Sequence, residues 1–319
     1  MKPYYSEDGI TLLNCDVLEG LASLAEESIQ CCVTSPPYWG LRDYGVAGQI
    51  GLEHTPGEYV ARMVEVFREV RRILKTDGTL WLNLGDSYNA AGRVGHGTRQ
   101  GYKQGTNRAS ANGSDHTRPS DESLKPKDLV GVPWRVAFAL QADGWYLRSD
   151  IIWHKPNPMP ESVTDRPTKA HEMLFLLAKS ERYHYDAEAI KEPATDTGRA
   201  NGRDGRVEDL SARPPNSSPR TLRRLDYSQR GRNKRSVWTI PTEPFPEAHF
   251  ATFPQALIEP CIKAGCPAGG TVLDPFAGSG TTGLVAKRYG CRAVLIELNA
   301  AYCAIAARRV AQGVLELTA

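Results

Sequence analysis

Long apolar runs are absent from this chain of 319 residues. No stretch approaches the roughly 18 consecutive apolar residues that a transmembrane helix needs. The opening residues, Met1–Glu7, contain no apolar signal-peptide core. We therefore expect a cytoplasmic protein without a membrane-spanning helix.

A cysteine framework and the common metal-ligand spacings are absent as well. The seven cysteines are an odd number without a regular spacing, and neither C-x-x-C nor H-E-x-x-H occurs. The sequence therefore predicts reduced thiols and no metal site.

An overall excess of charge is also lacking, because 39 Lys and Arg residues face 37 Asp and Glu residues, for a net charge of +2. The distribution is uneven. Two basic segments, Asn89–Lys127 and Thr195–Arg235, together carry +10, and the remaining chain carries −8. Contacts of Lys and Arg with phosphates supply most sequence-independent affinity for nucleic acids. Both segments are poor in apolar residues, so we expect them to be mobile until a polyanion binds.

The rest of the chain alternates strand-like and helix-like patterns. The expected strands are Gly9–Asn14, Ile29–Val33, Thr79–Leu84, Tyr146–Trp153, Met173–Ala178, Thr271–Leu273 and Ala293–Ile296. The expected helices are Val17–Glu26, Glu58–Leu74, Lys127–Ala142, Phe253–Ala264, Thr282–Tyr289 and Ala300–Gln312. Such alternation predicts an α/β fold with a largely parallel sheet.

A glycine-rich loop follows the strand expected at Thr271–Leu273. Gly278, Gly280 and Gly283 satisfy G-x-G-x-x-G, and Glu297 lies 19 residues beyond the first of them. In the dinucleotide-binding fingerprint the first glycine turns directly off the strand, whereas here four residues intervene. The loop therefore predicts a site for an adenosine-containing cofactor, with NAD as one alternative and a purely structural turn as another.

A rigid turn, Thr34–Gly40, follows the strand expected at Ile29–Val33, where open α/β sheets place their ligands. Two successive prolines remove two backbone donors. The turn therefore presents acceptors, the Ser35 hydroxyl and the Pro36 carbonyl, beside the aromatic ring of Tyr38. These groups suit a planar ring that carries an amino group, such as a nucleobase extruded from a duplex.

Together the two motifs resemble those of the DNA amino-methyltransferases, which methylate cytosine N4 or adenine N6 with S-adenosylmethionine. Members combine an (Asp/Asn/Ser)-Pro-Pro-(Tyr/Phe/Trp) turn with an Asp-Pro-Phe-x-Gly-Ser-Gly-Thr-Thr loop, here Ser35–Tyr38 and Asp274–Thr282. The catalytic turn comes first, as in the circularly permuted beta group. The resemblance implies a Rossmann-like, doubly wound, mostly parallel seven-stranded sheet with basic insertions.

The resemblance also implies a division of the chain. Residues 1–88 would form the catalytic half of the core, 89–127 a basic mobile loop, and 128–186 the remaining core strands and helix. Residues 187–236 would recognise the target, and 237–319 would form the cofactor-binding half.

Site residues carry over from the family's motifs. The turn that binds the base amino group would comprise Ser35, Pro36, Pro37 and Tyr38. The cofactor site would comprise Asp16, Thr252, Phe253, Pro254, Asp274, Pro275, Phe276, Gly278, Ser279, Gly280, Thr281, Thr282, Glu297 and Asn299. The residues expected to contact DNA are Arg220, Arg223, Arg224, Arg230, Arg232, Lys234 and Arg235. Trp153–Pro156 is a candidate lining of the DNA channel, to which we assign no chemistry.

The implied reaction is direct in-line methyl transfer to a flipped base at a specific site in duplex DNA. Serine at the head of the turn, together with Phe253-Pro254, favours cytosine N4, with adenine N6 as the alternative. Carbon-5 methylation is disfavoured because Pro260-Cys261 lies in a helix-like run and lacks the following Gln of that family.

Three further alternatives stay open. They are an NAD-dependent oxidoreductase, a non-catalytic nucleic-acid-binding protein with a methylase-like fold, and a related enzyme acting on RNA or protein. Duplex DNA is the implied partner, which would associate the protein with the nucleoid. A homodimer and a cognate restriction endonuclease, as in restriction–modification, are candidate further partners.

Overall fold

The computed structural model of the chain describes residues 1–41, 43–89, 121, 123–193, 231–243 and 253–312. The chain divides into two compact units, one formed by Met1–Asp186 and Ser236–Ala319 and the other by Ala187–Arg235. The first unit holds the sheet and both sequence motifs, and we call it the core unit.

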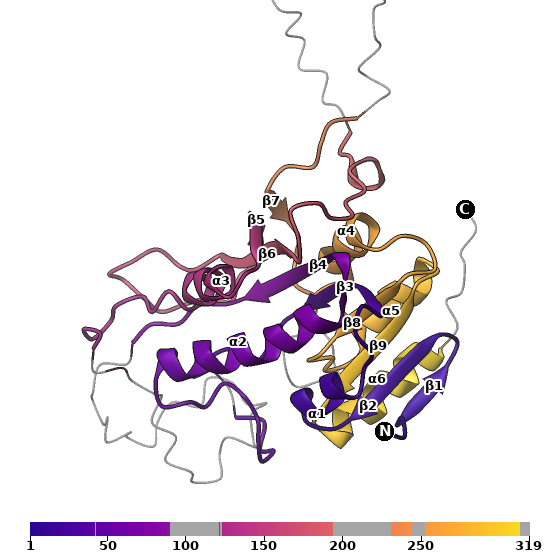
Figure 1. Ribbon diagram of the computed structural model, residues 1–319. Helices are drawn as coiled ribbons and strands as arrows, with labels where there is room; N and C mark the ends of the chain where they lie inside the picture. The colour runs from indigo at the N-terminus through magenta and orange to yellow at the C-terminus, as the bar shows by residue number, and fades with distance from the viewer. Residues whose placement is uncertain (42, 90–120, 122, 194–230, 244–252, 313–319) are drawn as a thin grey trace, which may run out of the picture. The chain divides into compact units, whose positions relative to one another are not determined.

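Among the described residues, the core unit contains a nine-stranded sheet in the order β1-β2-β9-β8-β3-β4-β6-β5-β7 (Figure 1). The strands are β1 (Tyr5–Glu7), β2 (Ile10–Asn14), β3 (Ile29–Thr34), β4 (Leu74–Leu84), β5 (Tyr146–His154), β6 (His171–Ala178), β7 (Val237–Thr239), β8 (Thr271–Asp274) and β9 (Arg292–Glu297). Strands β2, β9, β8, β3 and β4 pair in parallel, whereas β6 is antiparallel to both β4 and β5. This arrangement confirms the predicted α/β class with a mostly parallel sheet.

The sheet has two strands more than the seven expected, one at each edge. Strand β1 folds back antiparallel on β2 through Asp8 and Gly9, which both adopt positive φ angles. Strand β7 pairs in parallel with β5 at the opposite edge. Each added strand has three residues, too few to show a periodic pattern in the sequence.

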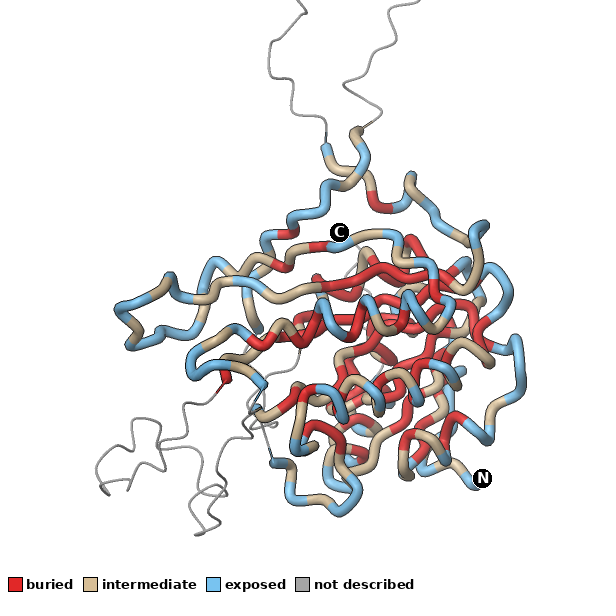
Figure 2. Tube along the Cα trace, turned by 60° about the vertical axis from the view of Figure 1, so that its left-hand side comes forward, coloured by how far each residue is buried: buried red, intermediate tan, exposed pale blue. Residues whose placement is uncertain are grey.

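In the part of the chain that the structure describes, three α-helices cover each face of the sheet. Helices α1 (Val17–Ala22), α2 (Pro56–Ile73) and α3 (Val132–Ala142) pack on one face, and α4 (Gln255–Gly265), α5 (Thr281–Arg288) and α6 (Ala300–Ala311) on the other. Figure 2 shows buried residues concentrated along the strands and on the inner sides of the helices. Among the described helices, none is long and apolar enough to cross a membrane.

Four helices begin at other residues than their apolar patterns predicted. Helix α4 starts at Gln255 and not at Phe253, and α5 starts at Thr281 and not at Thr282. Helix α2 starts at Pro56 because Thr55 and Glu58 form a capping box ahead of the apolar face. Helix α3 starts at Val132 and not at Lys127, since Lys127 and Gly131 have φ angles of 72° and 75°. Such left-handed residues interrupt an α-helix.

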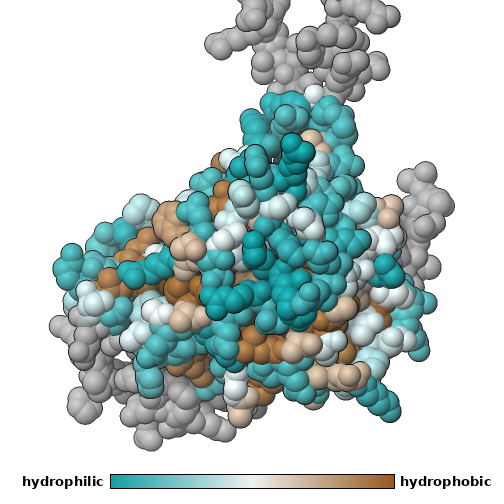
Figure 3. All heavy atoms as spheres, in the orientation of Figure 1, coloured by the Kyte–Doolittle hydropathy of each residue, from teal (hydrophilic) through white to brown (hydrophobic). Residues whose placement is uncertain are grey.

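Apolar atoms reach the surface over α3, as Figure 3 shows. The rings of Trp134 and Phe138 pack in a tilted arrangement with centroids 5.5 Å apart, and Phe138 is 55% exposed. The inner side of α3 is buried.

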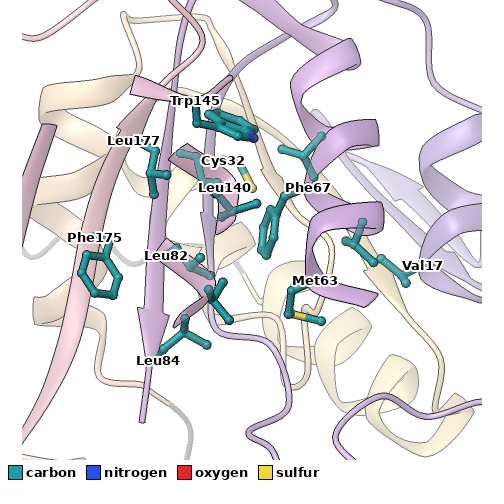
Figure 4. Close-up of a cluster of buried hydrophobic side chains, with 14 of the residues drawn as sticks. Val17, Cys32, Met63, Phe67, Leu82, Leu84, Leu140, Trp145, Phe175 and Leu177 are labelled. Carbon is teal, nitrogen blue, oxygen red and sulfur yellow. The ribbon is translucent and has the colours of Figure 1, made fainter. Parts of the chain in front are cut away.

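The principal core lies between the sheet and the helices α1, α2 and α3. Met63 and Phe67 extend from α2 toward Cys32 on β3 and Leu82 on β4, and Trp145 closes one end of this cluster (Figure 4). All five side chains are 2% exposed or less. Burial of this kind contributes about 1.5–3 kcal/mol for each large apolar side chain, so this layer holds the strand ends in fixed positions.

Candidate active site

The two sequence motifs meet because of the direction of the strands. The carboxyl ends of β2, β9, β8, β3, β4 and β5 share one edge of the sheet, since each strand is parallel to the others. The adjacent strands β8 and β3 lead into helices on opposite faces, α5 and α2. Open α/β sheets bind ligands at such a switch point.

A cavity at this edge is lined by both motifs. The catalytic-turn residues Ser35, Pro36, Pro37 and Tyr38 all line it. From the predicted cofactor set, the cavity is lined by Asp16, Phe253, Pro275, Phe276, Gly278, Ser279, Thr281, Glu297 and Asn299. Residues 240 positions apart in the chain thus face the same space.

Glu297, at the end of β9, is held in a defined orientation. Its carboxylate accepts hydrogen bonds from the backbone N–H groups of Gly278, at 2.8 Å, and Asn299, at 2.7 Å. Gly278 has a φ of 51°, a conformation that favours glycine. Burial raises the pKa of Glu297 above its ordinary value, and the two backbone bonds oppose that shift.

Asp16 and Asn299 each begin a helix at the rim of the cavity. The Asp16 carboxylate accepts from the Leu18 N–H at 2.8 Å, and the Asn299 side chain accepts from the Ala301 N–H at 2.9 Å. Helix starts of this kind keep side-chain oxygens and free backbone donors near the ligand space.

Asp274 and Thr282 lie behind the loop and do not line the cavity. The fully buried Asp274 carboxylate accepts from Thr34 Oγ1 at 2.7 Å, from Thr282 Oγ1 at 2.6 Å and from the Phe276 N–H at 3.1 Å. Burial raises its pKa to about 6, against the effect of these bonds. These hydrogen bonds join β3, β8 and α5, and we call them the Asp274 clamp.

Gly280 and Pro254 are likewise absent from the cavity lining. A Cβ at Gly280 would lie 2.9 Å from Ala306 Cβ, so this glycine permits α5 and α6 to pack closely. Pro254 precedes the first residue of α4. The remaining member of the predicted cofactor set, Thr252, lies outside the described residues.

A hydrogen-bond network, which we call the Tyr38 network, adjoins the catalytic turn. The Tyr38 hydroxyl donates to Glu172 Oε2 at 2.7 Å and accepts from Asn83 Nδ2 at 2.7 Å. The Ser35 hydroxyl donates to Tyr38 Oη at 3.2 Å, and Lys155 forms an ion pair with Glu172. All five side chains line the cavity.

The charges of this network are well defined. Burial raises the pKa of Tyr38 far above its ordinary range, and the Glu172 carboxylate adds to that shift. Burial alone would raise the pKa of Glu172, but Lys155 and the hydrogen bonds from Tyr38 and Asn83 bring it below its ordinary value. At neutral pH Tyr38 is therefore a neutral phenol and Glu172 an anion.

Sequence reasoning missed Asn83 and Glu172 and gave Lys155 no chemistry. The available signal was polarity inside apolar strands: Asn83 interrupts T-L-W-L-N-L, and Glu172 opens the run before Met173–Ala178. Neither residue belongs to a recognisable motif, so only the strand pairing reveals their proximity.

Three of the predicted DNA-binding residues are described, and they lie in the second unit. Arg232 Nε and Arg235 Nε each lie 3.2 Å from Glu192 Oε2, and Lys234 Nζ lies 4.0 Å from Oε1. Two backbone hydrogen bonds between Glu192 and Arg232 form an isolated antiparallel bridge that joins the two described segments of this unit. The other four, Arg220, Arg223, Arg224 and Arg230, lie outside the described residues.

Cys261, the candidate nucleophile of the disfavoured carbon-5 reaction, is buried in α4. Its thiol donates to the Leu257 carbonyl at 3.3 Å, and it does not line the cavity. Its environment is that of a core residue.

The sheet is doubly wound, a glycine-rich loop follows β8, and the acidic residue Glu297 ends the adjacent strand β9. These features together define a cofactor site of the kind found in methyltransferases. A sequence profile described as DNA methylase, of the N6/N4 type, matches residues 29–308. The chain therefore belongs to the N6/N4 DNA methylase family, whose members are S-adenosylmethionine-dependent methyltransferases, as the motifs predicted.

Individual relatives agree with this assignment. The chain is 48% identical over 295 residues to the type II methyltransferase M.SmaI of Serratia marcescens, covering 92% of this chain and 88% of the relative. It is 48% identical over 304 residues to M.Cfr9I of Citrobacter freundii, covering 95% and 88%.

Solved structures share the fold. The PvuII DNA methyltransferase, described as cytosine-N4-specific, matches with a TM-score of 0.64 at 22% identity, over 97% of this chain and 88% of that one. A DNA modification methylase of Thermus thermophilus, TTHA0409, complexed with S-adenosyl-L-methionine, matches with a TM-score of 0.57 at 25% identity, over 95% of each chain.

The cavity residues fit S-adenosylmethionine. The oriented Glu297 carboxylate offers acceptors for a ribose diol, and the cavity walls beside it include the apolar side chains of Phe276, Ile296 and Phe253. Carboxylates and backbone N–H groups on the same rim suit the charged amino-acid end of such a molecule.

Proposed function

We propose that this DNA methyltransferase acts on the exocyclic N4 of cytosine, extruded from duplex DNA at a specific sequence. The observation that carries the proposal is the shared cavity, in which the Ser35–Tyr38 turn faces the loop Pro275–Ser279. A base held by the turn and a cofactor held by the loop would meet there.

The turn acts by binding and positioning the base. The Ser35 hydroxyl oxygen and the Pro36 carbonyl accept hydrogen bonds from the amino group, which favours a nitrogen lone pair released from the ring. The ring of Tyr38 packs against the base. S-adenosylmethionine, when bound, supplies an electrophilic methyl group on a sulfonium. Correct alignment of two reactants contributes much of the catalysis in such a site.

The cofactor residues fall into two groups by role. Asp16, Phe276, Ser279, Glu297 and their neighbours on the cavity wall would contact the cofactor. Asp274, Gly280 and Thr282 would act indirectly, by shaping the loop that presents those contacts.

Two features support cytosine over adenine. Serine heads the turn, and Phe253-Pro254 precedes α4. The neighbour with a TM-score of 0.64 is described as cytosine-N4-specific, although at 22% identity it supports only the fold.

We further infer that the chain is circularly permuted, because β8 and β9 from its end lie in the sheet between β2 and β3 from its beginning. Residues 187–236 would recognise the target sequence and 89–127 would close over the duplex. The relatives are named type II methyltransferases, which favours a cognate restriction endonuclease as a partner. A homodimer is a further proposal.

Nucleoside mass spectrometry of DNA from cells that express the protein tests the assignment. We expect N4-methylcytosine in excess over cells that express the Ser35→Ala variant, and sequencing gives its context. N6-methyladenine instead would overturn the choice of base, and the absence of both would overturn DNA methylation.

A further inference from the structure

We propose that Glu172 is a positioning residue that fixes the direction of hydrogen bonding at Ser35, so that the site accepts an amino group and rejects a carbonyl. The inference deepens the proposed function and rests on it. It concerns a residue that touches the catalytic turn only through Tyr38.

The direction follows from counting protons. The phenol of Tyr38 has a single proton, and at 2.7 Å from Glu172 Oε2 it is donated to the carboxylate. The contact of 3.2 Å between Ser35 and Tyr38 must then be donated by Ser35. Asn83 Nδ2 lies 3.3 Å from Ser35 Oγ, but its two protons go to the nearer acceptors, Tyr38 Oη at 2.7 Å and Glu172 Oε2 at 3.0 Å. The lone pairs of Ser35 Oγ therefore remain for a donor in the cavity.

The orientation of Asn83 agrees with this direction. Its amide nitrogen lies 3.0 Å from Glu172 Oε2, so the NH₂ group faces the carboxylate. Its carbonyl oxygen is buried and has no hydrogen-bond partner among the described residues. An unpaired buried acceptor is unfavourable. The negative charge of Glu172 offsets this cost, because it attracts the NH₂ group of Asn83 and repels its carbonyl oxygen.

Neutralising Glu172 would reverse the pattern. A glutamine at this position can donate to Tyr38 Oη, which frees the phenol proton to point at Ser35. The Ser35 hydroxyl would then point its proton into the cavity. An amino group there is also a donor, so the two groups could not form a hydrogen bond. Such a site would prefer the O4 of uracil to the N4 of cytosine.

Binding to two matched duplexes tests the inference without catalysis. One duplex carries cytosine at the methylated position, the other uracil, and S-adenosylhomocysteine replaces the reactive cofactor. We expect wild-type protein to prefer cytosine by about tenfold or more, the scale of one base-edge contact. Glu172→Gln should bring the ratio of cytosine to uracil affinity to one or below it. The mismatch opposite uracil affects both proteins equally.

Glu259→Gln is the matched control. Glu259 also pairs with a lysine, Lys263 at 2.7 Å, but it lies on α4 outside the cavity. It should keep the wild-type ratio. An unchanged ratio in Glu172→Gln, with the protein folded, would overturn the inference.

The pH profile of kcat gives a second test, should Glu172→Gln fold poorly. The groups that face Glu172 are Lys155 directly after β5, Lys169 ahead of β6, Tyr38 from the turn and the uncharged Asn83 from β4. Activity should fall as acid protonates Glu172. Lys155→Met removes the main charge that opposes the effect of burial, so the acidic limb should move to higher pH. A limb that stays in place would contradict the inference.

Failure of the proposed function is distinguishable. If wild-type protein forms no methylated nucleoside, the proposed function is wrong. If wild-type protein methylates but Glu172→Gln matches Glu259→Gln in rate and base preference, only this inference is wrong. If adenine is the target, hypoxanthine replaces uracil as the carbonyl probe.

Discussion

Ser35 and Tyr38 have separate tasks within one turn, and substitutions separate them. Ser35→Ala removes an acceptor for the amino group, and Tyr38→Ala removes the ring that packs on the base. We expect methylation to fall by about 10²–10³-fold in Ser35→Ala, the usual loss of one positioned polar group at a reacting centre. Tyr38→Ala should also lose most activity. Single-turnover assays with labelled cofactor measure both.

Cofactor binding is the control for these variants. Neither side chain belongs to the loop that follows β8, so calorimetry should give nearly unchanged affinity for S-adenosylmethionine. Near-normal turnover in both variants would show that the turn is not catalytic.

Gly85 leaves no room for a side chain beside Tyr38. A Cβ there would lie 2.4 Å from Tyr38 Cε2 and 2.7 Å from Cδ2. The ring cannot shift freely because its hydroxyl is held by Glu172 and Asn83. Gly85→Ala should therefore lower kcat at least tenfold and destabilise the fold by about 1–3 kcal/mol, as overpacking does.

A glycine without such a neighbour gives the comparison. A Cβ at Gly57, in the first turn of α2, would meet only Thr55 Oγ1, at 3.8 Å. Gly57→Ala should keep wild-type activity. Equal activity of the two variants would mean that the position of Tyr38 is not critical.

At the scale of elements, the Asp274 clamp couples β3 to β8 and α5. Thr34→Val keeps the shape of the side chain but removes one donor to a buried carboxylate, which should cost about 1–3 kcal/mol of unfolding free energy. Thr271→Val is the control: Thr271 lies on β8 with Asp274 but makes no hydrogen bond to it, so this variant should change stability by less than about 0.5 kcal/mol. Urea denaturation measures both, and equal effects would show that the clamp is unimportant.

The same carboxylate gives stability a pH dependence. Burial raises the pKa of Asp274 to about 6 in the folded state, whereas an unfolded Asp titrates near about 3.9. Between these values the unfolded state binds fewer protons, so the free energy of unfolding attributable to Asp274 decreases as pH rises, by on the order of 3 kcal/mol in total. Well above pH 6, where Asp274 is ionised in both the folded and the unfolded state, this contribution is constant.

Thr34→Val should extend that decrease to higher pH, because it removes a bond that lowers the pKa of Asp274. Urea denaturation between pH 4 and 8 measures this effect. The difference in the free energy of unfolding between wild type and Thr34→Val should grow with pH. A difference independent of pH would contradict the titration of Asp274.

Elements differ in how far sequence alone could predict them. The apolar face of α2 and the runs that form β3 and β4 are long enough for their periodicity to be decisive. The three-residue strands β1 and β7 are not. The site divides in the same way: contiguous motifs identified the Ser35 turn and the loop after β8. Glu172 and Asn83 become neighbours only through the β4–β6 register, which pairs Asn83 with Leu174.

At the scale of the whole molecule, the charge distribution is the remaining evidence about DNA. The core is acidic, and +10 of charge lies in the two basic segments. In the described part of the second unit, Glu192 faces three cations, Arg232, Lys234 and Arg235. One carboxylate leaves a local excess of two positive charges there.

Neutralising part of this charge tests whether the second unit grips DNA. The variant replaces four arginines by glutamine, at Arg223, Arg224, Arg230 and Arg232. Each phosphate contact that is lost should reduce the slope of log K against log salt by about 0.9, so both affinity at low salt and its salt dependence should fall. The matched control removes four exposed cations from the core unit, at Lys2, Lys75, Arg182 and Arg288. Loss of net charge is the same in both, so only local contacts distinguish them. If the slope of log K against log salt is equal in the two variants, the main phosphate contacts lie elsewhere. Asn89–Lys127 would then be the next segment to neutralise.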